Sequence, residues 1–164
     1  MCCIQQAHCT AIRCIFTVWD ELKFLFGGPQ EQADIKQFLE ANGLLHQDIE
    51  PADLKHFLLV RDGPEMVGLV GLEIRGDDAL LRSLAVAGGY RNKGLATLLV
   101  DKIEDYARSL KIRTLYLLTL TAESFFAKRD FQPTARTNAP AGIQNTAEFK
   151  GLCPASAAFM TKRL

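Results

Sequence analysis

The sequence has no net charge and no long apolar run. Its 19 lysine and arginine residues balance 19 aspartate and glutamate residues among 164, so the overall charge does not favour nucleic acid or an anionic membrane as a partner. Near the start, Arg13, Asp20 and Glu21 interrupt the only candidate apolar run, which is too short to cross a bilayer. We therefore expect neither partner, and any anion-binding site has to be local.

A basic start and a small-residue cleavage site are also missing, so residues 1–20 do not read as a signal peptide. Four of the five cysteines fall within this stretch, which does not suit a disulfide framework spread over a small secreted fold. We expect a cytoplasmic protein with reduced thiols and no metal, and residues 1–20 as a peripheral extension. The alternative is a soft-metal or arsenite site, although its spacing matches no common zinc pattern; its ligands would be Cys2, Cys3, Cys9, Cys14 and His8.

Residues 21–164 are expected to form one α+β domain. The hydrophobic content of 48% and the charged content of 23% suit a single compact core. Strand-like runs separated by glycine-containing turns, with amphipathic helical patterns between some of them, predict a mixed, mostly antiparallel central sheet flanked by helices. The expected strands are 22–26, 55–62, 66–74, 80–86, 113–120 and 155–164, and the expected helices are 31–44, 91–110 and a short one ending near 130.

An anion-binding turn is predicted after the strand-like run 80–86, where an amphipathic helix begins. Backbone N–H groups at a helix start have no intrahelical partner and can bind an anion. Two cations at that start oppose the helix dipole, which favours a bound anion. The sequence lacks the GxxxxGKS or GxxxxGKT pattern and has too few glycines for the dinucleotide fingerprint. The predicted pyrophosphate site consists of Arg91, Asn92, Lys93, Gly94, Leu95 and Ala96.

This order of strand, cationic Arg-x-x-Gly-x-Ala turn and helix resembles the acetyl-CoA-binding motif of the GNAT N-acetyltransferases. A later stretch, TLTAESFFAKRDF, resembles a second motif of that family. Ala122, Phe125 and Phe131 match it, whereas Thr119 stands where the family often has Asn, and Asp130 where it usually has Gly. Aspartate can adopt the left-handed conformation that glycine favours. The resemblance implies a single-domain GNAT-like fold and an acetyltransferase.

Three segments in this order, GDDALLRSLAV, TLTAESFF and LCPASAAFM, are similar to the GNAT subgroup of arsenic-resistance N-acetyltransferases. The better-known relatives of that subgroup acetylate the amino group of arsinothricin or phosphinothricin. The resemblance covers residues 22–164 and implies acetyl-CoA as co-substrate and a small-molecule amine as acceptor. It leaves a homodimer open, as well as two other functions: a non-catalytic acyl-CoA sensor, and a protein-lysine or N-terminal acetyltransferase.

On the cofactor side, the resemblance implies that the backbone of Leu84, Ala85 and Val86 binds the pantetheine arm, because an extended amide chain can add to an open strand edge. Thr119 and Phe125 are also assigned to the binding of acetyl-CoA. These five residues extend the predicted pyrophosphate site toward the reacting thioester.

Phe126 is a departure from the family pattern. Many members have a tyrosine there, which donates a proton to the departing thiolate. Phenylalanine has no such proton, so we expect Ser124 or water to assist a thiol whose pKa is about 8.5. Phe126 and Ser83 are assigned to the acceptor substrate, with core packing as the alternative for at least one of Phe125 and Phe126.

The strand register places two charges on one face of the sheet. If residues 75–78 close a tight hairpin, Glu73 pairs with Leu80, and Glu73 and Arg82 become diagonal neighbours. Arg82 would then bind a carboxylate of the acceptor, while Glu73 accepts the amine proton directly or through water. The alternative is a structural ion pair between two strands, and a slip of one residue would remove the pairing altogether.

Overall fold

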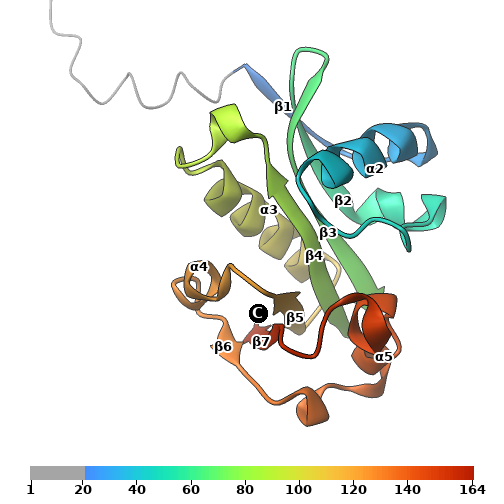
Figure 1. The fold of residues 1–164 in the computed structure, drawn as a ribbon, viewed down its shortest axis with the longest axis vertical. Coiled ribbons are helices and arrows are strands. Elements are labelled where there is room, and N and C mark those ends of the chain that lie inside the picture. Colours follow the sequence, from blue (N-terminus) through green and yellow to red (C-terminus); the bar gives the residue numbers. More distant parts are fainter. Residues whose placement is uncertain (1–20) are drawn as a thin grey trace, which may run out of the picture.

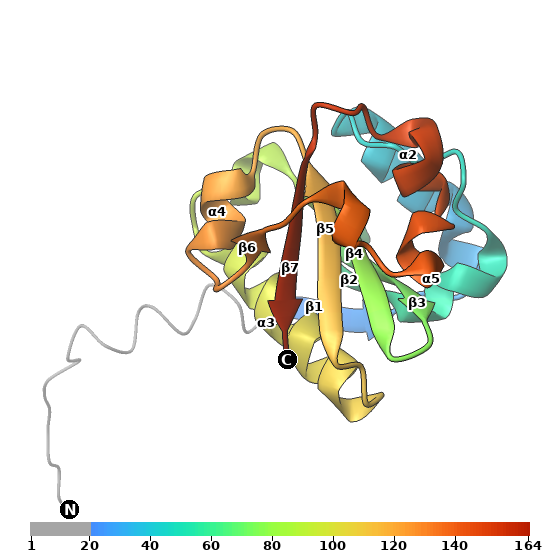
Figure 2. The same cartoon turned by 90° about the horizontal axis from the view of Figure 1, so that it is seen from below.

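The computed structural model describes residues 21–164. The extension expected over residues 1–20, and the soft-metal alternative placed on it, lie outside the described residues. The described chain forms a seven-stranded sheet with helices on both faces (Figures 1 and 2). This architecture confirms the predicted α+β class with a mixed, mostly antiparallel sheet.

Across the sheet the strands follow the order β1-β2-β3-β4-β5-β7-β6, and every neighbouring pair is antiparallel except β4 and β5. Helix α3 connects this parallel pair, as a parallel connection requires. The strands are β1 (Leu22–Phe26), β2 (Phe57–Asp62), β3 (Glu65–Arg75), β4 (Asp78–Val86), β5 (Thr114–Thr119), β6 (Gln132–Pro133) and β7 (Ala158–Arg163). The helices are α2 (Gln32–Ala41), α3 (Leu95–Ser109), α4 (Glu123–Ala127) and α5 (Ala141–Gln144), with 3-10 turns η1 (Pro29–Glu31), η2 (Pro51–His56), η3 (Gly88–Tyr90) and η4 (Arg136–Asn138), and the π-helical turn η5 (Glu148–Leu152).

Glycines at positive φ end the predicted elements. Gly43 (φ 69°) follows α2, Gly63 (φ 55°) lies between β2 and β3, and Gly76 (φ 67°) lies between β3 and β4. All three adopt the left-handed conformation, which costs glycine little. The second hairpin pairs Glu73 with Leu80, so the predicted register is confirmed.

Two parts of the chain differ from the sequence-based expectation. Helix α3 begins at Leu95 rather than at residue 91, because Asn92 (φ 59°) and Gly94 (φ 89°) adopt left-handed conformations that interrupt a helix. The polar stretch after Phe131, where only a closing strand was predicted, contains β6, η4, α5 and η5. These elements are too short to produce a hydrophobic period that a sequence pattern can reveal.

A β-bulge in β4 changes which face its side chains occupy. Leu69 of β3 pairs with Ala85 and Gly71 pairs with Arg82, so Ser83 and Leu84 together oppose a single residue of β3. Ser83 has a φ of 60°, the conformation that inserts an extra residue into a strand. As a result, Leu84 contacts the apolar cluster beneath α3, whereas Arg82 occupies the opposite face.

The two faces of the sheet are covered differently. Helix α3 lies over one continuous apolar cluster that includes Leu81 and Leu99. On the other face, α2 and η2 cover one cluster, around Phe57 and Leu59, while α5 covers a separate one, around Leu80 and Phe159. Figure 2 shows α2 and α5 on the side of the sheet away from α3. The strand positions of Glu73 and Arg82 lie between these two smaller clusters.

Candidate active site

The strands β4 and β5 separate along their length. Their parallel pairing joins only residues 78–80 to residues 114–116, although β4 continues to Val86 and β5 to Thr119. Beyond Leu80, the edge of β4 that faces β5 has no strand partner among the described residues. An extended amide chain can hydrogen-bond to such an edge, and Leu84, Ala85 and Val86, which the resemblance assigned to the pantetheine arm, lie on it.

The turn before α3 presents unpaired backbone donors. Gly94 is the N-cap of this 15-residue helix, and the first backbone bond of the helix runs from the N–H of Leu98 to the carbonyl of Gly94 at 3.0 Å. The N–H groups of Leu95, Ala96 and Thr97 donate no bond within residues 21–164. A Cβ atom built on Gly94 meets nothing within 4 Å. The turn is thus open and positively polarised, as an anion site requires.

A cavity of about 570 Å³ opens at this turn, a volume within the usual range for small-molecule sites. Helix α4 forms its other wall, with Ser124 and Phe125. Three cations line it, which suits a ligand that carries several phosphates. The lining residues are Val86, Tyr90, Arg91, Asn92, Gly94, Leu95, Ala96, Thr97, Ser124, Phe125, Lys128 and Arg129.

The predicted cations of the turn have different positions. Arg91 lines the cavity, but its Nε donates to the carbonyl of Val86 and its Nη2 to Oδ1 of Asn42, both at 2.8 Å. Lys93 does not line the cavity, and its Nζ donates to the carbonyl of Gly89 at 2.7 Å. The turn therefore relies on backbone donors and Arg91 more than on Lys93.

Arg129 is a cavity residue that the sequence reasoning missed. Its guanidinium stacks 3.7 Å from the ring centre of Phe125, its Nη1 donates to the carbonyl of Phe125 at 2.8 Å, and its Nη2 donates to Oγ1 of Thr97. Arg129 thus connects α4 to the start of α3. The basic pair Lys128-Arg129, one turn after Phe125, was the available signal in the sequence.

The second motif is arranged in part as predicted. Oγ1 of Thr119 accepts a hydrogen bond from the N–H of Ala122 at 3.0 Å, which shapes the passage from β5 to α4 but does not place Thr119 in the cavity lining. Asp130 has a φ of 66°, so it does adopt the left-handed conformation expected of it. Phe126 is buried edge-on against Phe125 and Phe131, so its predicted contact with the acceptor has no structural support.

On the opposite face, Arg82 is the centre of a four-residue ionic cluster. Its Nη1 and Nη2 donate to the two oxygens of Asp48 at 2.6 and 2.7 Å. Nη1 also lies 3.2 Å from Oε2 of Glu73, and Nη2 lies 2.9 Å from Oε1 of Glu148. The arginine side chain is 4% exposed. We call these residues, Asp48, Glu73, Arg82 and Glu148, the Arg82 cluster.

The cluster confirms the predicted proximity of Glu73 and Arg82, but both terminal nitrogens of Arg82 are already engaged. A carboxylate of the acceptor could reach them only by displacing Asp48. The sequence reasoning missed Asp48, which lies in a polar loop after α2, and Glu148, which lies in η5. Neither residue stands in a periodic pattern, so no sequence signal identified them. Oγ of Ser83, beside Arg82, is buried and has no hydrogen-bond partner within the described part of the chain, residues 21–164.

Burial and charge shift the titration of these groups. Burial raises the pKa of Asp48, but the hydrogen bond and charge of Arg82 outweigh it, so the net pKa lies below the ordinary value. Burial lowers the pKa of Arg82, and the surrounding carboxylates outweigh that effect and raise it. Burial raises the pKa of Glu148; Arg82 opposes the rise and the two other carboxylates reinforce it. Burial and Glu148 raise the pKa of the Cys153 thiol to about 11.

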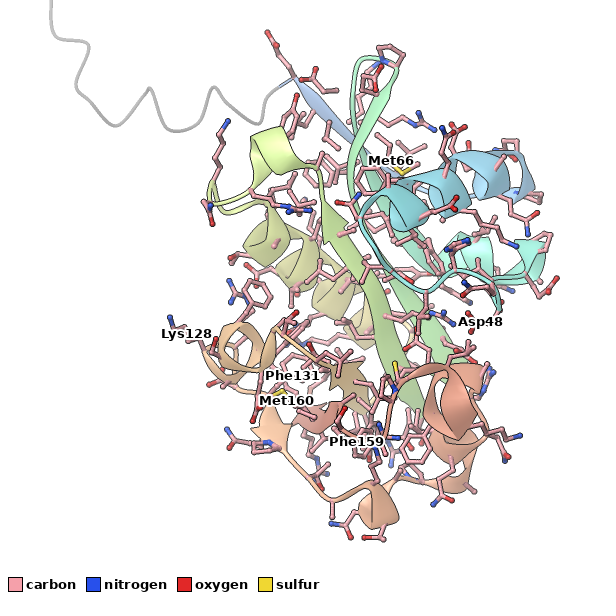
Figure 3. The ribbon with its side chains drawn as sticks, viewed as in Figure 1. Asp48, Met66, Lys128, Phe131, Phe159 and Met160 are labelled. Atoms are coloured by element: carbon pink, nitrogen blue, oxygen red, sulfur yellow. The ribbon has the colours of Figure 1, made fainter. Side chains whose placement is uncertain are left out.

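The cavity and the Arg82 cluster lie on opposite sides of β4. In Figure 3, Lys128 of the cavity and Asp48 of the cluster lie on either side of that strand. The separation of β4 from β5 begins next to Arg82. A donor on one face and an acceptor on the other can therefore meet between the two strands.

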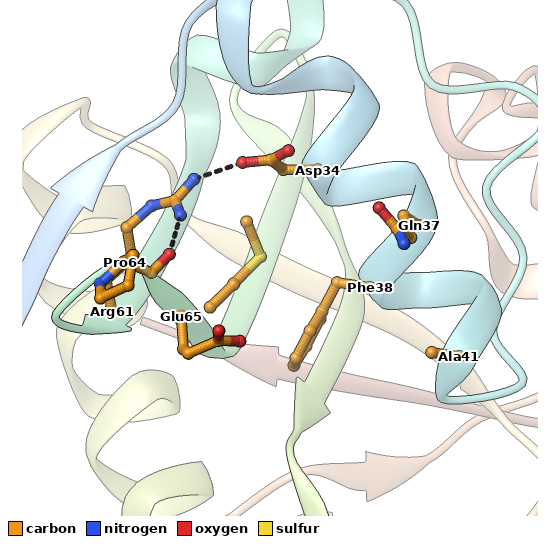
Figure 4. A pocket seen from close by; sticks show the side chains of 8 residues that line it. Asp34, Gln37, Phe38, Ala41, Arg61, Pro64 and Glu65 are labelled. Atoms are coloured by element: carbon orange, nitrogen blue, oxygen red, sulfur yellow. Dashed lines mark hydrogen bonds and ion pairs between the residues drawn. The ribbon is translucent and has the colours of Figure 1, made fainter.

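A second groove, of about 320 Å³, lies between α2 and the β2–β3 hairpin (Figure 4). Its one arginine is already engaged: Nη2 of Arg61 lies 2.8 Å from Oδ2 of Asp34, and Nη1 donates to the carbonyl of Pro64 at 2.8 Å. The cavity beside α3, with its unpaired backbone donors and three cations, is therefore the stronger candidate for a ligand site. Among residues 21–164, no group of three or more metal-binding side chains is found, and no helix there has the length and apolarity needed to span a membrane.

These features define an α+β domain with an open helix-start turn beside a cavity on one face and an ionic cluster on the other. The model of the acetyltransferase (GNAT) family matches residues 16–131. The chain belongs to this family, which confirms the family expected from the sequence. The matched residues make up more than half of the chain, and they include the turn before α3 and both predicted motifs.

The curated relatives are amino-acid acetyltransferases. The protein from Azotobacter vinelandii (strain DJ / ATCC BAA-1303) is 33% identical over 108 residues, which is 63% of this chain and 25% of the relative. The protein from Pseudomonas aeruginosa (strain LESB58) is 28% identical over 117 residues, which is 68% of this chain and 27% of the relative. The chain thus spans about a quarter of the length of these relatives.

Solved structures share the fold. N-acetylglutamate synthase from Neisseria gonorrhoeae, complexed with coenzyme A and L-arginine, superposes with a TM-score of 0.72 at 20% identity, over 87% of this chain and 33% of that chain. An acetyltransferase of the GNAT family from Staphylococcus aureus MU50 superposes with a TM-score of 0.67 at 18% identity, over 87% of this chain and 99% of that chain. At these identities the comparison supports the fold alone.

Proposed function

We propose that the chain is an acetyl-CoA-dependent N-acetyltransferase that acts on the amine of a small molecule. The observation that carries the proposal is the separation of β4 from β5 beyond Leu80, together with a cavity beside α3 and the Arg82 cluster on β4. The chain's residues fit the co-substrate, because the turn offers free N–H groups and nearby cations to a pyrophosphate, and β4 offers an unpaired edge to an amide-containing arm.

Each part of the chain then has a defined task. The turn of residues 91–97, with Arg129, binds and orients the phosphates. The edge at Leu84, Ala85 and Val86 holds the arm in line with the opening, where proximity supplies much of the rate acceleration. When bound, acetyl-CoA supplies the activated acetyl group. Ser124 lines the cavity and is our candidate to assist the departing thiolate, since Phe126 has no hydroxyl.

For the acceptor we propose an amino-acid-like amine. The amino-acid acetyltransferase relatives support this class, and the resemblance to the arsenic-resistance subgroup narrows it to toxins such as arsinothricin or phosphinothricin. In the same proposal, Arg82 binds the acceptor's carboxylate, which requires that this carboxylate displace Asp48 from the guanidinium. A homodimer stays a prediction, which light scattering after gel filtration tests.

A panel of amines with acetyl-CoA tests the proposed activity. It should include proteinogenic amino acids, phosphinothricin, arsinothricin, a diamine and a lysine peptide. Mass spectrometry of the product is the readout, because the chain's own five cysteines would react with a thiol reagent. Transfer to a small amine supports the proposal. Tight binding of acetyl-CoA without transfer to any amine would instead indicate the non-catalytic sensor.

The cofactor site has its own test. Gly94→Asp adds bulk and a negative charge to the turn, so calorimetry should show weaker binding of acetyl-CoA. Gly43→Asp is the matched control, because Gly43 also has a positive φ with nothing within 4 Å of a built Cβ, and it lies outside the cavity lining. Equal affinities for the two folded variants would place the cofactor elsewhere.

A further inference from the structure

We propose that Glu148, rather than Glu73, accepts the proton of the acceptor amine. The inference rests on the proposed function and assigns a catalytic residue in the site already described. It follows from the position of Glu148, from the partners of both glutamates, and from the charge of the cluster that contains them.

Glu148 lies where the acceptor must arrive. Its segment η5 packs next to α5, which contacts β4, and its carboxylate is 2.9 Å from Arg82. Arg82 is the second residue of β4 beyond Leu80, where the pairing with β5 ends. Arg82 precedes Leu84, the start of the edge assigned to the pantetheine arm, by two residues, and the bulge at Ser83 lies between them. Glu148 is thus beside the opening, on the face away from the cofactor cavity.

The two glutamates differ in their free oxygens. Glu73 is engaged at both: Oε1 accepts from Arg75 and Oε2 from Arg82. Glu148 has one ion pair, from Oε1 to Arg82, and no side-chain hydrogen bond or ion pair within residues 21–164 involves its Oε2. A base needs an oxygen that can take a proton, and Glu148 retains one.

The cluster carries surplus negative charge. Three carboxylates surround one buried guanidinium, and Arg75 neutralises only Glu73 from a more exposed position. Buried charge without a partner is costly, so the site is complementary to a cationic group. An acceptor amine, which is an ammonium at neutral pH, is such a group. The titratable and charged groups that act on Glu148 are Arg82, Asp48 and Glu73, and Glu148 in turn acts on Cys153. Farther out, Lys36 acts on Asp48, and Arg136 acts on Cys153.

The proton transfer balances without another reactant. The ammonium gives one proton to the carboxylate of Glu148 and becomes a neutral amine. The amine nitrogen forms a bond to the acetyl carbon, the carbon–sulfur bond breaks, and the sulfur leaves with the electron pair. The second proton of the nitrogen passes to the thiolate, directly or through water or Ser124. Glu148 then releases its proton to solvent.

The environment of Glu148 supports this role. Burial raises its pKa, Arg82 opposes the rise, and the neighbouring carboxylates reinforce it. A base whose pKa lies nearer the operating pH accepts a proton more readily. Glu148 is charged above that raised pKa, so activity should fall as the pH is lowered through it.

The test is Glu148→Gln, assayed with an acceptor that the wild-type protein acetylates. We expect kcat to fall by about 100-fold to 10,000-fold, with the loss shrinking at high pH, where more of the acceptor is already neutral. The acidic limb of the pH profile of kcat/KM should disappear, and the affinity for acetyl-CoA should not change. Glu73→Gln should lower kcat less than Glu148→Gln does.

Glu104→Gln is the matched control. Glu104 is equally buried and also ion-paired, with Lys162 and Arg108, but it lies on α3 outside the site, so its variant should keep kcat and the acidic limb. If Glu148→Gln does not fold, Glu148→Asp provides the test. Moving the carboxylate should shift the acidic limb of the pH profile of kcat/KM. An unshifted limb, or a Glu148→Gln variant with wild-type kcat, overturns the inference. Failure of the wild-type protein to acetylate any amine overturns the proposed function instead.

Discussion

Replacing Arg82 by methionine tests the cluster most directly, since methionine keeps much of the apolar stem and removes the charge. The change leaves three carboxylates, each at most 13% exposed, without their common partner. Two unit charges 3 Å apart interact by about 5 kcal/mol at an effective dielectric constant near 20. Three such pairs exceed the total stability of many domains, but the desolvation of four ions offsets most of that sum.

The net loss on removing one partner of a buried ion pair is about 3–5 kcal/mol. We expect a loss of this size in the free energy of unfolding of Arg82→Met, against a total of about 5–15 kcal/mol for a domain. Arg61→Met is the control, because Arg61 pairs with Asp34, whose side chain is 57% exposed. Removing an exposed pair costs about 0–1 kcal/mol.

Urea denaturation of both variants at several pH values is the assay. In the wild-type protein the pKa of Asp48 is lowered, so Asp48 contributes stability above its unfolded pKa, and that contribution is lost as the pH falls through the folded pKa. The deficit of Arg82→Met should therefore be largest above about pH 5 and shrink toward about pH 3. A deficit no larger than that of Arg61→Met, or one independent of pH, would refute the reasoning. A normal stability with a raised KM for the acceptor would favour the carboxylate clamp.

Three further predictions concern other parts of the chain. Gly71→Ala should destabilise the protein by about 1–3 kcal/mol, because its Cβ would lie 2.6 Å from the buried ring of Phe57, whereas Gly88→Ala meets nothing within 4 Å and should be neutral in the same denaturation assay. Cys153, whose pKa of about 11 exceeds the ordinary 9.0, should react with iodoacetamide at pH 8 about 100-fold more slowly than in urea-unfolded protein; peptide mapping that finds similar rates would contradict this. Deleting residues 1–20 should leave acetyl transfer intact, because every residue of the proposed site follows them in the chain, and a folded but inactive truncation would show the extension to be functional.

The residues of the proposed cofactor-binding half could be predicted from the sequence because they are close to one another in the chain. A strand, a turn with Gly94 and an amphipathic helix follow one another directly, and each leaves its own periodic pattern. The hairpin register was accessible for the same reason, since a short turn at Gly76 sets the pairing of Glu73. The start of α3 was predicted four residues too early, because the left-handed conformations of Asn92 and Gly94 depend on how the turn packs.

Most residues of the proposed acceptor-binding half could not be predicted from the sequence. Asp48 and Glu148 come from irregular segments 100 positions apart, and no period or motif relates them. Arg82 was recognised as a charge within an apolar strand, but its partners beyond the neighbouring strand were not. Phe126 was considered a substrate contact, and its burial against Phe131 depends on where α4 packs.

By itself, then, the sequence determined the α+β class, the order of the main elements and the open turn before α3, because these follow from short-range patterns of apolar residues, glycines and cations. Tertiary structure alone decided the Arg82 cluster and the opening beside it. The bulge at Ser83 moves Leu84 to the other face of the sheet, and the loop after α2 and the segment η5 meet only when their separate apolar clusters pack. Contacts between segments distant in the chain depend on that packing, which no local pattern encodes.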